Sequence, residues 1–154
     1  MFSALHTIHR PAAQPPNHDW HRYLALPLKR NDPAKAIDDL QAAAPYELGS
    51  PGNTAAFTPS LYPIYVRGQA FLASHRGSEA AAEFQKILKW PGVVLNEPIA
   101  PLARLGLARS YALQGDTAKA RAAYEDFLKL WEDADGGIPV LQQARSEFAK
   151  LATT

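Results

Sequence analysis

The sequence predicts an all-α fold, and three observations carry this prediction. Alanine is in excess, with 28 of 154 residues. Apolar residues recur at helical spacings of three and four, whereas no run alternates apolar and polar residues as a half-buried strand would. Glycine and proline interrupt these periodic stretches in the way that is typical of helix ends. We therefore expect five or six helices joined by turns.

Composition excludes several classes of protein. With 47% apolar and 20% charged residues, the chain is typical of one soluble domain. The net charge of +1 gives no overall field for nucleic acid or anionic lipid. The absence of cysteine excludes a disulfide scaffold, thiolate zinc sites and a cysteine nucleophile. No apolar stretch approaches the roughly 20 residues of a membrane helix. We therefore expect a cytoplasmic protein with no cofactor, no nucleic-acid partner and no membrane span.

Proline divides the chain into two parts, because nine of the 13 prolines precede residue 64. We interpret residues 1–18 as a disordered leader, since they have no sustained periodicity. Residues 19–152 are expected to form the helical domain. Within it, residues 19–30 have helical apolar spacing, but Pro27 would break or kink a helix there.

Helix starts and turns can be placed from capping residues. Asp32 can cap a helix, and Pro33 suits the first helical position because its missing N–H needs no partner there. Gly77-Ser78 and Gly115-Asp116 each predict a turn followed by a cap. The expected helices cover residues 32–45, 60–76, 79–90, 99–114, 117–134 and 138–152, with a loop over 46–59.

An ungapped internal repeat with a spacing of 40 residues organises these helices. In both copies a small residue is followed by an aromatic residue three positions later and by an alanine nine positions after that. A second aromatic residue comes four positions after the alanine, and an apolar residue follows three positions later. The small residues allow paired helices to lie close, and the aromatic side chains fill the space between one pair and the next. The two matching sets are Gly68, Phe71, Ala80, Phe84 and Ile87, and Ala108, Tyr111, Ala120, Tyr124 and Phe127.

This pattern resembles the tetratricopeptide repeat, a helix–turn–helix unit of about 34 residues. The resemblance implies a short α-α solenoid. Its units would be a partial repeat over 19–45, repeats over 61–94 and 101–134, and a capping helix over 138–152. Arg67 and Arg104 depart from the family pattern, which prefers large apolar residues there. We expect the stems of these arginines to lie along the surface.

A tighter resemblance is to the C-terminal repeat region of acidobacterial multidomain serine/threonine protein kinases. It covers about residues 31–151 and is carried by the runs LYPIYVRGQAFLA, AAAEFQKIL, LGLARSYALQGDTAKARAAYEDFLKLWEDAD and IPVLQQARSEFAKL. It implies a regulatory or docking segment. The chain has no glycine-rich phosphate loop, His-Arg-Asp loop or Asp-Phe-Gly motif, so we expect it to be no enzyme.

The resemblance also implies where a partner binds, because the first helix of each pair lines the concave face of such a solenoid. A helical projection places eight residues on this concave face, away from the side of each helix that packs against its neighbours. They are Tyr62, Tyr65, Gln69, Leu72, Leu102, Leu105, Arg109 and Leu113. This groove would suit an apolar peptide or a helix, with Arg109 binding a carboxylate. Replacing Tyr65 or Arg109 would then weaken a partner but barely change stability. The alternative is that these residues pack against the last helix or the N-terminal segment.

One partner class is not expected in this groove. Tetratricopeptide domains that bind chaperone C-terminal carboxylates use lysines and asparagines on this face. In this chain Tyr65 and Leu105 stand where the lysines would be, and Gln69 and Arg109 stand where the asparagines would be. The groove therefore lacks the clamp for an acidic tail.

Self-association is a second expectation. The half-repeat at 32–45 lacks a regular first helix, so its inner surface would be left open. Either residues 19–30 fold back over it or a second copy of the chain covers it.

The N-terminal histidines raise the question of a metal site. Four of the five histidines occur as His6-x2-His9 and His18-x2-His21, and residues three apart on a helix could share a zinc or nickel ion. Three prolines interrupt this segment, and metal ligands need rigid support. We therefore interpret it as a solvated leader and predict no metal site.

Overall fold

The structure is a computed structural model that describes residues 32–42, 44, 47, 61–91 and 98–151, and within these it has six helices and no strand. The all-α class is confirmed for this part of the chain. The helices are α2 (Pro33–Gln41), α3 (Tyr62–Ala73), α4 (Gly77–Lys89), α6 (Ile99–Leu113), α7 (Thr117–Leu130) and α8 (Pro139–Leu151). The expected leader, the segment 19–30 and the loop over 46–59, except Glu47, lie outside the described residues.

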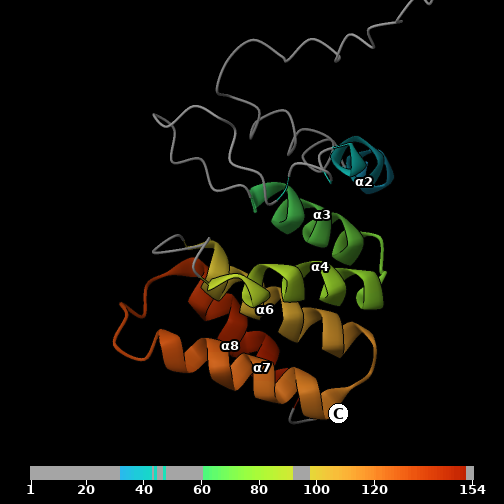
Figure 1. The fold of residues 1–154 in the computed structure, drawn as a ribbon. Coiled ribbons are helices and arrows are strands. Elements are labelled where there is room, and N and C mark those ends of the chain that lie inside the picture. The colour runs from blue at the N-terminus through green and yellow to red at the C-terminus, as the bar shows by residue number, and fades with distance from the viewer. Residues whose placement is uncertain (1–31, 43, 45–46, 48–60, 92–97, 152–154) are drawn as a thin grey trace, which may run out of the picture.

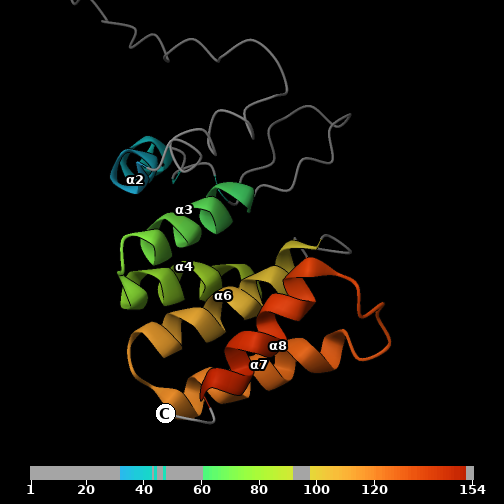
Figure 2. The ribbon, with the colours of Figure 1, turned by 180° about the vertical axis from the view of Figure 1, so that it is seen from behind.

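The first five helices follow one another through the molecule in chain order, each packed against the next (Figure 1). α3 also contacts α6. Figure 2 shows that α8 lies across α6 and α7 on the opposite side of the molecule. In the described part of the chain, every helix is too short or too polar to span a bilayer.

Two of the predicted helix caps are confirmed and one is wrong. Asp32 and Asp116 each accept a hydrogen bond from the backbone N–H three residues later, at 3.0 and 3.1 Å. These bonds satisfy donors that the first helical turn leaves unpaired. Ser78 does not cap α4, because that helix begins at Gly77, two residues earlier than expected, and its N-cap residue Arg76 makes no side-chain cap.

The turns after α3 and α6 have the same backbone conformation. His75 (φ 56°) and Gly115 (φ 76°) occupy the left-handed region, at positions separated by the repeat spacing. In each turn the next residue donates its N–H to the carbonyl oxygen five residues back, at 2.9 and 3.0 Å. This is the Schellman arrangement for ending a helix. The first turn is therefore centred on His75. Gly77, where the turn was predicted, is the first residue of α4.

α7 ends earlier than expected, at Leu130 instead of residue 134. The N–H of Trp131 bonds to the carbonyl oxygens of Leu128 and Lys129, and the chain then turns. Acidic residues follow directly, and negative charge at a helix C-terminus opposes the helix dipole.

Phe84 of α4 is the centre of the first apolar cluster, which is formed by α3, α4 and α6. Its ring is fully buried, and a glycine on each neighbouring helix makes room for it. A Cβ atom at Gly68 would lie 2.8 Å from the ring, and one at Gly106 would lie 2.5 Å from it. The predicted packing role of Gly68 is confirmed, whereas Gly106 is not part of the repeat pattern. The small repeat residues Ala80, Ala108 and Ala120 are also fully buried.

A second apolar cluster joins α6, α7 and α8. Phe127 and Leu141 are fully buried in it, and Tyr124 is nearly so. Tyr111 was expected to fill space between helix pairs in the same way. It is only half-buried, and its hydroxyl accepts a hydrogen bond from Gln85 Nε2 at 2.9 Å.

Candidate functional site

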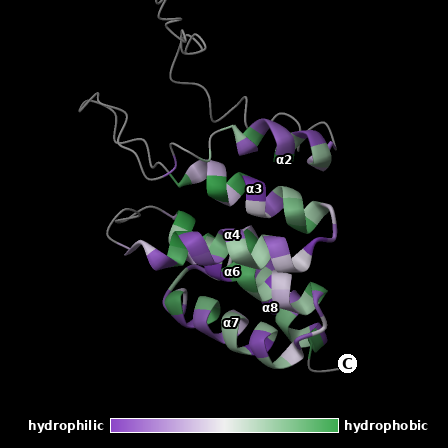
Figure 3. Ribbon diagram, turned by 45° about the vertical axis from the view of Figure 1, so that its right-hand side comes forward, coloured by the Kyte–Doolittle hydropathy of each residue, from purple (hydrophilic) through white to green (hydrophobic). Residues whose placement is uncertain are grey.

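α3 contains one charged residue, Arg67, in a mainly apolar helix. Figure 3 shows purple turns near the middle of a mainly green α3, and the sequence has Arg67 in this part. Arg67 Nη1 lies 2.5 Å from Glu47 Oε1, and Nη2 lies 2.5 Å from Glu83 Oε2. Nη1 also donates to the carbonyl oxygen of Leu40 at 3.2 Å. Only 2% of Arg67 is exposed, so the expectation of a stem along the surface is wrong for this residue.

The Arg67 cluster is electrostatically balanced. Burial alone would lower the pKa of Arg67, but the carboxylates of Glu47 and Glu83 outweigh that influence and the pKa is raised. Lys86 Nζ donates to the other oxygen of Glu83 at 2.7 Å. The cluster thus pairs two carboxylates with two cations. It holds α2, α3, α4 and Glu47 together and leaves no unpaired arginine for a ligand.

The predicted groove residues on α3 lie beside Arg109 of α6. Burial raises the pKa of Tyr65, while the positive charge of Arg109 and a hydrogen bond with Gln69 lower it. Tyr62 is close enough to raise the same pKa. The ring of Tyr65 packs edge-on against Phe84, with centroids 5.8 Å apart. The structure therefore brings these two tyrosines, the amide and the cation together, and each is partly exposed.

The α6 side of the predicted groove is covered by α8. Leu105 is 1% exposed and belongs to the cluster that contains Leu141 and Ala144 of α8. It is therefore not available to a partner, and the alternative of packing against the last helix holds for this residue. Leu102 is partly exposed, and Leu113 is 41% exposed at the end of α6.

Arg109 binds a carboxylate, and the carboxylate belongs to α8. Its Nε and Nη2 donate to the two oxygens of Glu147, at 2.9 and 3.1 Å. Tyr124 of α7 donates its hydroxyl to the same carboxylate at 2.9 Å. Burial raises the pKa of Tyr124, and the negative charge of Glu147 raises it further. Replacing Arg109 would leave this carboxylate half-buried without its cation, so we now expect the replacement to lower the stability of the fold as well as to weaken a partner.

Sequence reasoning missed the acidic partners of Arg67 and Arg109, two of which lie on helices. Glu83 lies between Ala80 and Ile87 on the packed side of α4, and Glu147 lies three residues after Ala144 on the packed side of α8. A carboxylate on an apolar stripe predicts a cation on the facing helix, because a buried charge needs a partner. That signal was present in the sequence.

The exposed remainder of the predicted groove is the part on α3. We call Tyr62, Tyr65, Gln69 and Leu72 the α3 strip; all four are partly exposed. Among the described residues, no group of three or more histidines and acids could hold a metal ion. The N-terminal histidines lie outside those residues.

Comparisons of the chain with protein-family models, with curated proteins and with solved structures found no match.

Proposed function

We propose that this chain is a non-catalytic interaction scaffold of tetratricopeptide-type repeats, which binds a peptide or a helix of a partner protein along the α3 strip. The observation that carries the proposal is the partly exposed row of two tyrosines, an amide and a leucine beside Arg109. Binding surfaces favour tyrosine, because its ring buries apolar area while its hydroxyl keeps a polar partner.

The repeat assignment has independent support from local geometry. The two turns at the repeat spacing have matching left-handed residues and matching hydrogen bonds. The small residues Gly68 and Ala108, also one repeat apart, are both buried at helix contacts. Each of these features is a property of a helical hairpin that recurs along the chain.

The charge around the α3 strip favours a particular kind of partner. Glu147 already neutralises Arg109, so the strip offers no unpaired charge to an acidic ligand. Its own side chains are aromatic, apolar and amide. We therefore expect a largely uncharged segment whose apolar side chains pack on the tyrosines and whose polar groups bond to Gln69.

A capture experiment tests this proposal. The wild-type chain is compared with a Tyr65→Phe, Gln69→Ala, Leu72→Ala variant, which removes the polar and aliphatic ends of the strip but keeps the buried ring. A Gln142→Ala, Gln143→Ala variant is the control, since both glutamines are exposed on α8. We expect one set of proteins to be retained by the wild type and the control and lost with the strip variant. Equal retention by all three folded chains would refute the proposal.

A second candidate function rests on the sequence resemblance over residues 31–151. In that case the chain is the regulatory or docking segment of a serine/threonine protein kinase, and it brings substrate proteins to a catalytic domain outside these residues. The test is to read the coding sequence upstream of Met1 in the same frame. The kinase motifs would support this candidate, and an in-frame stop codon just upstream would remove it.

A further inference from the structure

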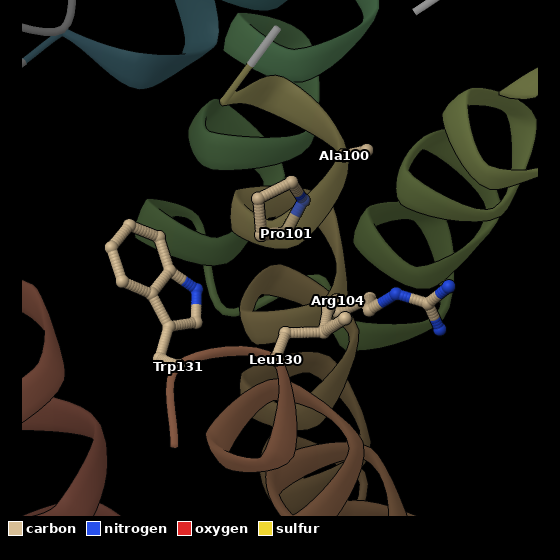
Figure 4. Close-up of a pocket in the computed structure, with 5 residues that line it drawn as sticks. All are labelled: Ala100, Pro101, Arg104, Leu130 and Trp131. Atoms are coloured by element: carbon tan, nitrogen blue, oxygen red, sulfur yellow. The ribbon is translucent and has the colours of Figure 1, made fainter. Parts of the chain in front are cut away.

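An apolar hollow lies at the end of the molecule where α6 begins and α7 ends. Its volume is about 380 Å³. It is lined by Ala100, Pro101 and Arg104 of α6, by Leu130 at the end of α7 and by Trp131 directly after it (Figure 4). Successive residues of a helix are rotated by about 100°, so Pro101 and Arg104 lie on a different face of α6 from the groove positions. No residue of the α3 strip lines the hollow, so the two surfaces are distinct.

Leu130 stands exposed at the edge of this hollow. It is 58% exposed, the highest value among the large hydrophobic residues exposed in the described part, where Trp90 and Leu113 reach 42% and 41%. A single exposed leucine is ordinary, but an exposed leucine beside an apolar hollow provides both halves of a packing contact. Within one chain Leu130 is part of the wall of the hollow, so it does not fill it.

Opposite charges flank the hollow. Figure 4 shows the guanidinium of Arg104 pointing away from Trp131, and within the described residues it has no ion-pair or hydrogen-bond partner. Glu132 and Asp133 follow Trp131 directly in the turn, and neither side chain is ion-paired with a described residue. Arg104 lines the hollow, and the two exposed acids directly follow Trp131, which also lines it, so charges of both signs occur beside the apolar centre. In a two-fold arrangement of identical surfaces, such a patch is complementary to itself.

We propose that a second copy of this chain docks on this end. Leu130 of each copy enters the hollow of the other, and Arg104 of each copy pairs with Glu132 and Asp133 of the other. The net charge of +1 does not oppose association. The half-repeat at 32–45 is a weaker candidate for the dimer surface, because none of the exposed large hydrophobic residues in the described part lies on α2.

The small size of the patch sets its strength. Stable interfaces bury roughly 1,200–2,000 Å² of surface, and a contact made by a leucine in a hollow buries less. We therefore expect the dimer to form at micromolar or higher concentration. The α3 strip is left open in each copy. A dimer would then present two strips and hold a partner with two binding segments more tightly than the monomer does.

Sedimentation equilibrium of the full chain from about 1 to 500 µM tests the dimer. The average mass of the wild type should rise from 16.8 kDa towards twice that value. Leu130→Ser should weaken the association at least tenfold. Leu113→Ser is the matched control, because it removes an exposed leucine from the other end of α6 and should behave as the wild type. A wild type that stays monomeric throughout, or a dimer that Leu130→Ser leaves intact, would overturn the proposal.

Charge reversal tests the two-fold pairing. Arg104→Glu alone and Glu132→Lys with Asp133→Lys alone each place like charges opposite each other, and both variants should remain monomeric. Mixed together they should form a heterodimer, because every contact then joins opposite charges. The expected heterodimer affinity is within a few fold of the wild-type value. Failure of the mixture to associate, when the wild type dimerises, would exclude this arrangement.

Discussion

The ring of Phe84 occupies the space in which a side chain at Gly106 would lie. A Cβ atom at position 106 would be 2.5 Å from Cζ of that ring, closer than any ordinary contact. Gly68 approaches the same ring from α3. One aromatic side chain of α4 thus sets the separation of three helices, and it thereby positions the α3 strip beside Arg109 of α6.

Gly106→Ala should therefore destabilise the fold by about 1–3 kcal/mol, the usual cost of forcing extra atoms into a packed core. The measurement is urea unfolding followed by circular dichroism. Gly136→Ala is the control, since a Cβ there meets no atom closer than 3.9 Å. Combining Gly106→Ala with Phe84→Leu should recover part of the loss, because the smaller side chain vacates the space. If the effects of the two substitutions on stability simply add, the contact between position 106 and the Phe84 ring is not what destabilises Gly106→Ala.

Arg67→Met should be among the most destabilising single changes, at about 3–5 kcal/mol, because it leaves two buried carboxylates without their cation. The triple variant Arg67→Met, Glu47→Leu, Glu83→Leu should be more stable than Arg67→Met, since no unpaired charge remains. Thermal and urea unfolding give both values. If Arg67→Met costs less than about 1 kcal/mol, the cluster is not buried as described.

His75→Gly should stabilise the protein by about 0.5–1 kcal/mol, because a left-handed φ of 56° costs energy in a residue with a Cβ atom and none in glycine. For a chain of this size the melting temperature should rise by about 1–4 °C. Ser74→Gly is the control, since Ser74 has a φ of −89° and gains nothing from glycine. A melting temperature that falls with His75→Gly would argue against the turn conformation.

Alkaline pH should weaken the fold through Tyr124. Its pKa is raised above the ordinary value of 10.0 in the folded state, so above that pH the unfolded chain loses the proton first. The contribution to stability is complete below about pH 10 and declines as the pH rises further. Tyr124→Phe should lower the free energy of unfolding by about 1–2 kcal/mol at neutral pH, because the hydrogen bond to Glu147 is lost. It should also make the loss of stability at alkaline pH less steep. Unfolding curves at pH 7 to 11 measure both effects, and an equal alkaline slope in the two proteins would contradict the assignment.

The helices and their order could be predicted from the sequence because the signals are local. Apolar residues every three or four positions mark each helix, and capping residues such as Asp32 and Asp116 fix where two of them begin. The turn at His75 was misplaced because a histidine carries no turn signal of its own. Its position becomes clear only when the repeat spacing is applied to Gly115.

The candidate site was predictable in part. Residues at helical spacing on α3 share a face, and the repeat spacing places Arg109 on the corresponding face of α6. The position of α8 was not predictable, because the last helix is outside the repeat and no spacing fixes its register against Leu105. The burial of Arg67 also depends on acids 16 and 20 residues away, which only the packed helices bring together.

The most direct test of the central claim is site-specific photo-crosslinking from the α3 strip. Benzoylphenylalanine replaces Leu72, which is partly exposed on the strip. In the control it replaces Ala118, which is exposed on α7. Both chains are irradiated in an extract of the native cells, and the products are identified by mass spectrometry. The account predicts a defined protein crosslinked from position 72 and absent from position 118. No product, or the same products from both positions, would contradict it.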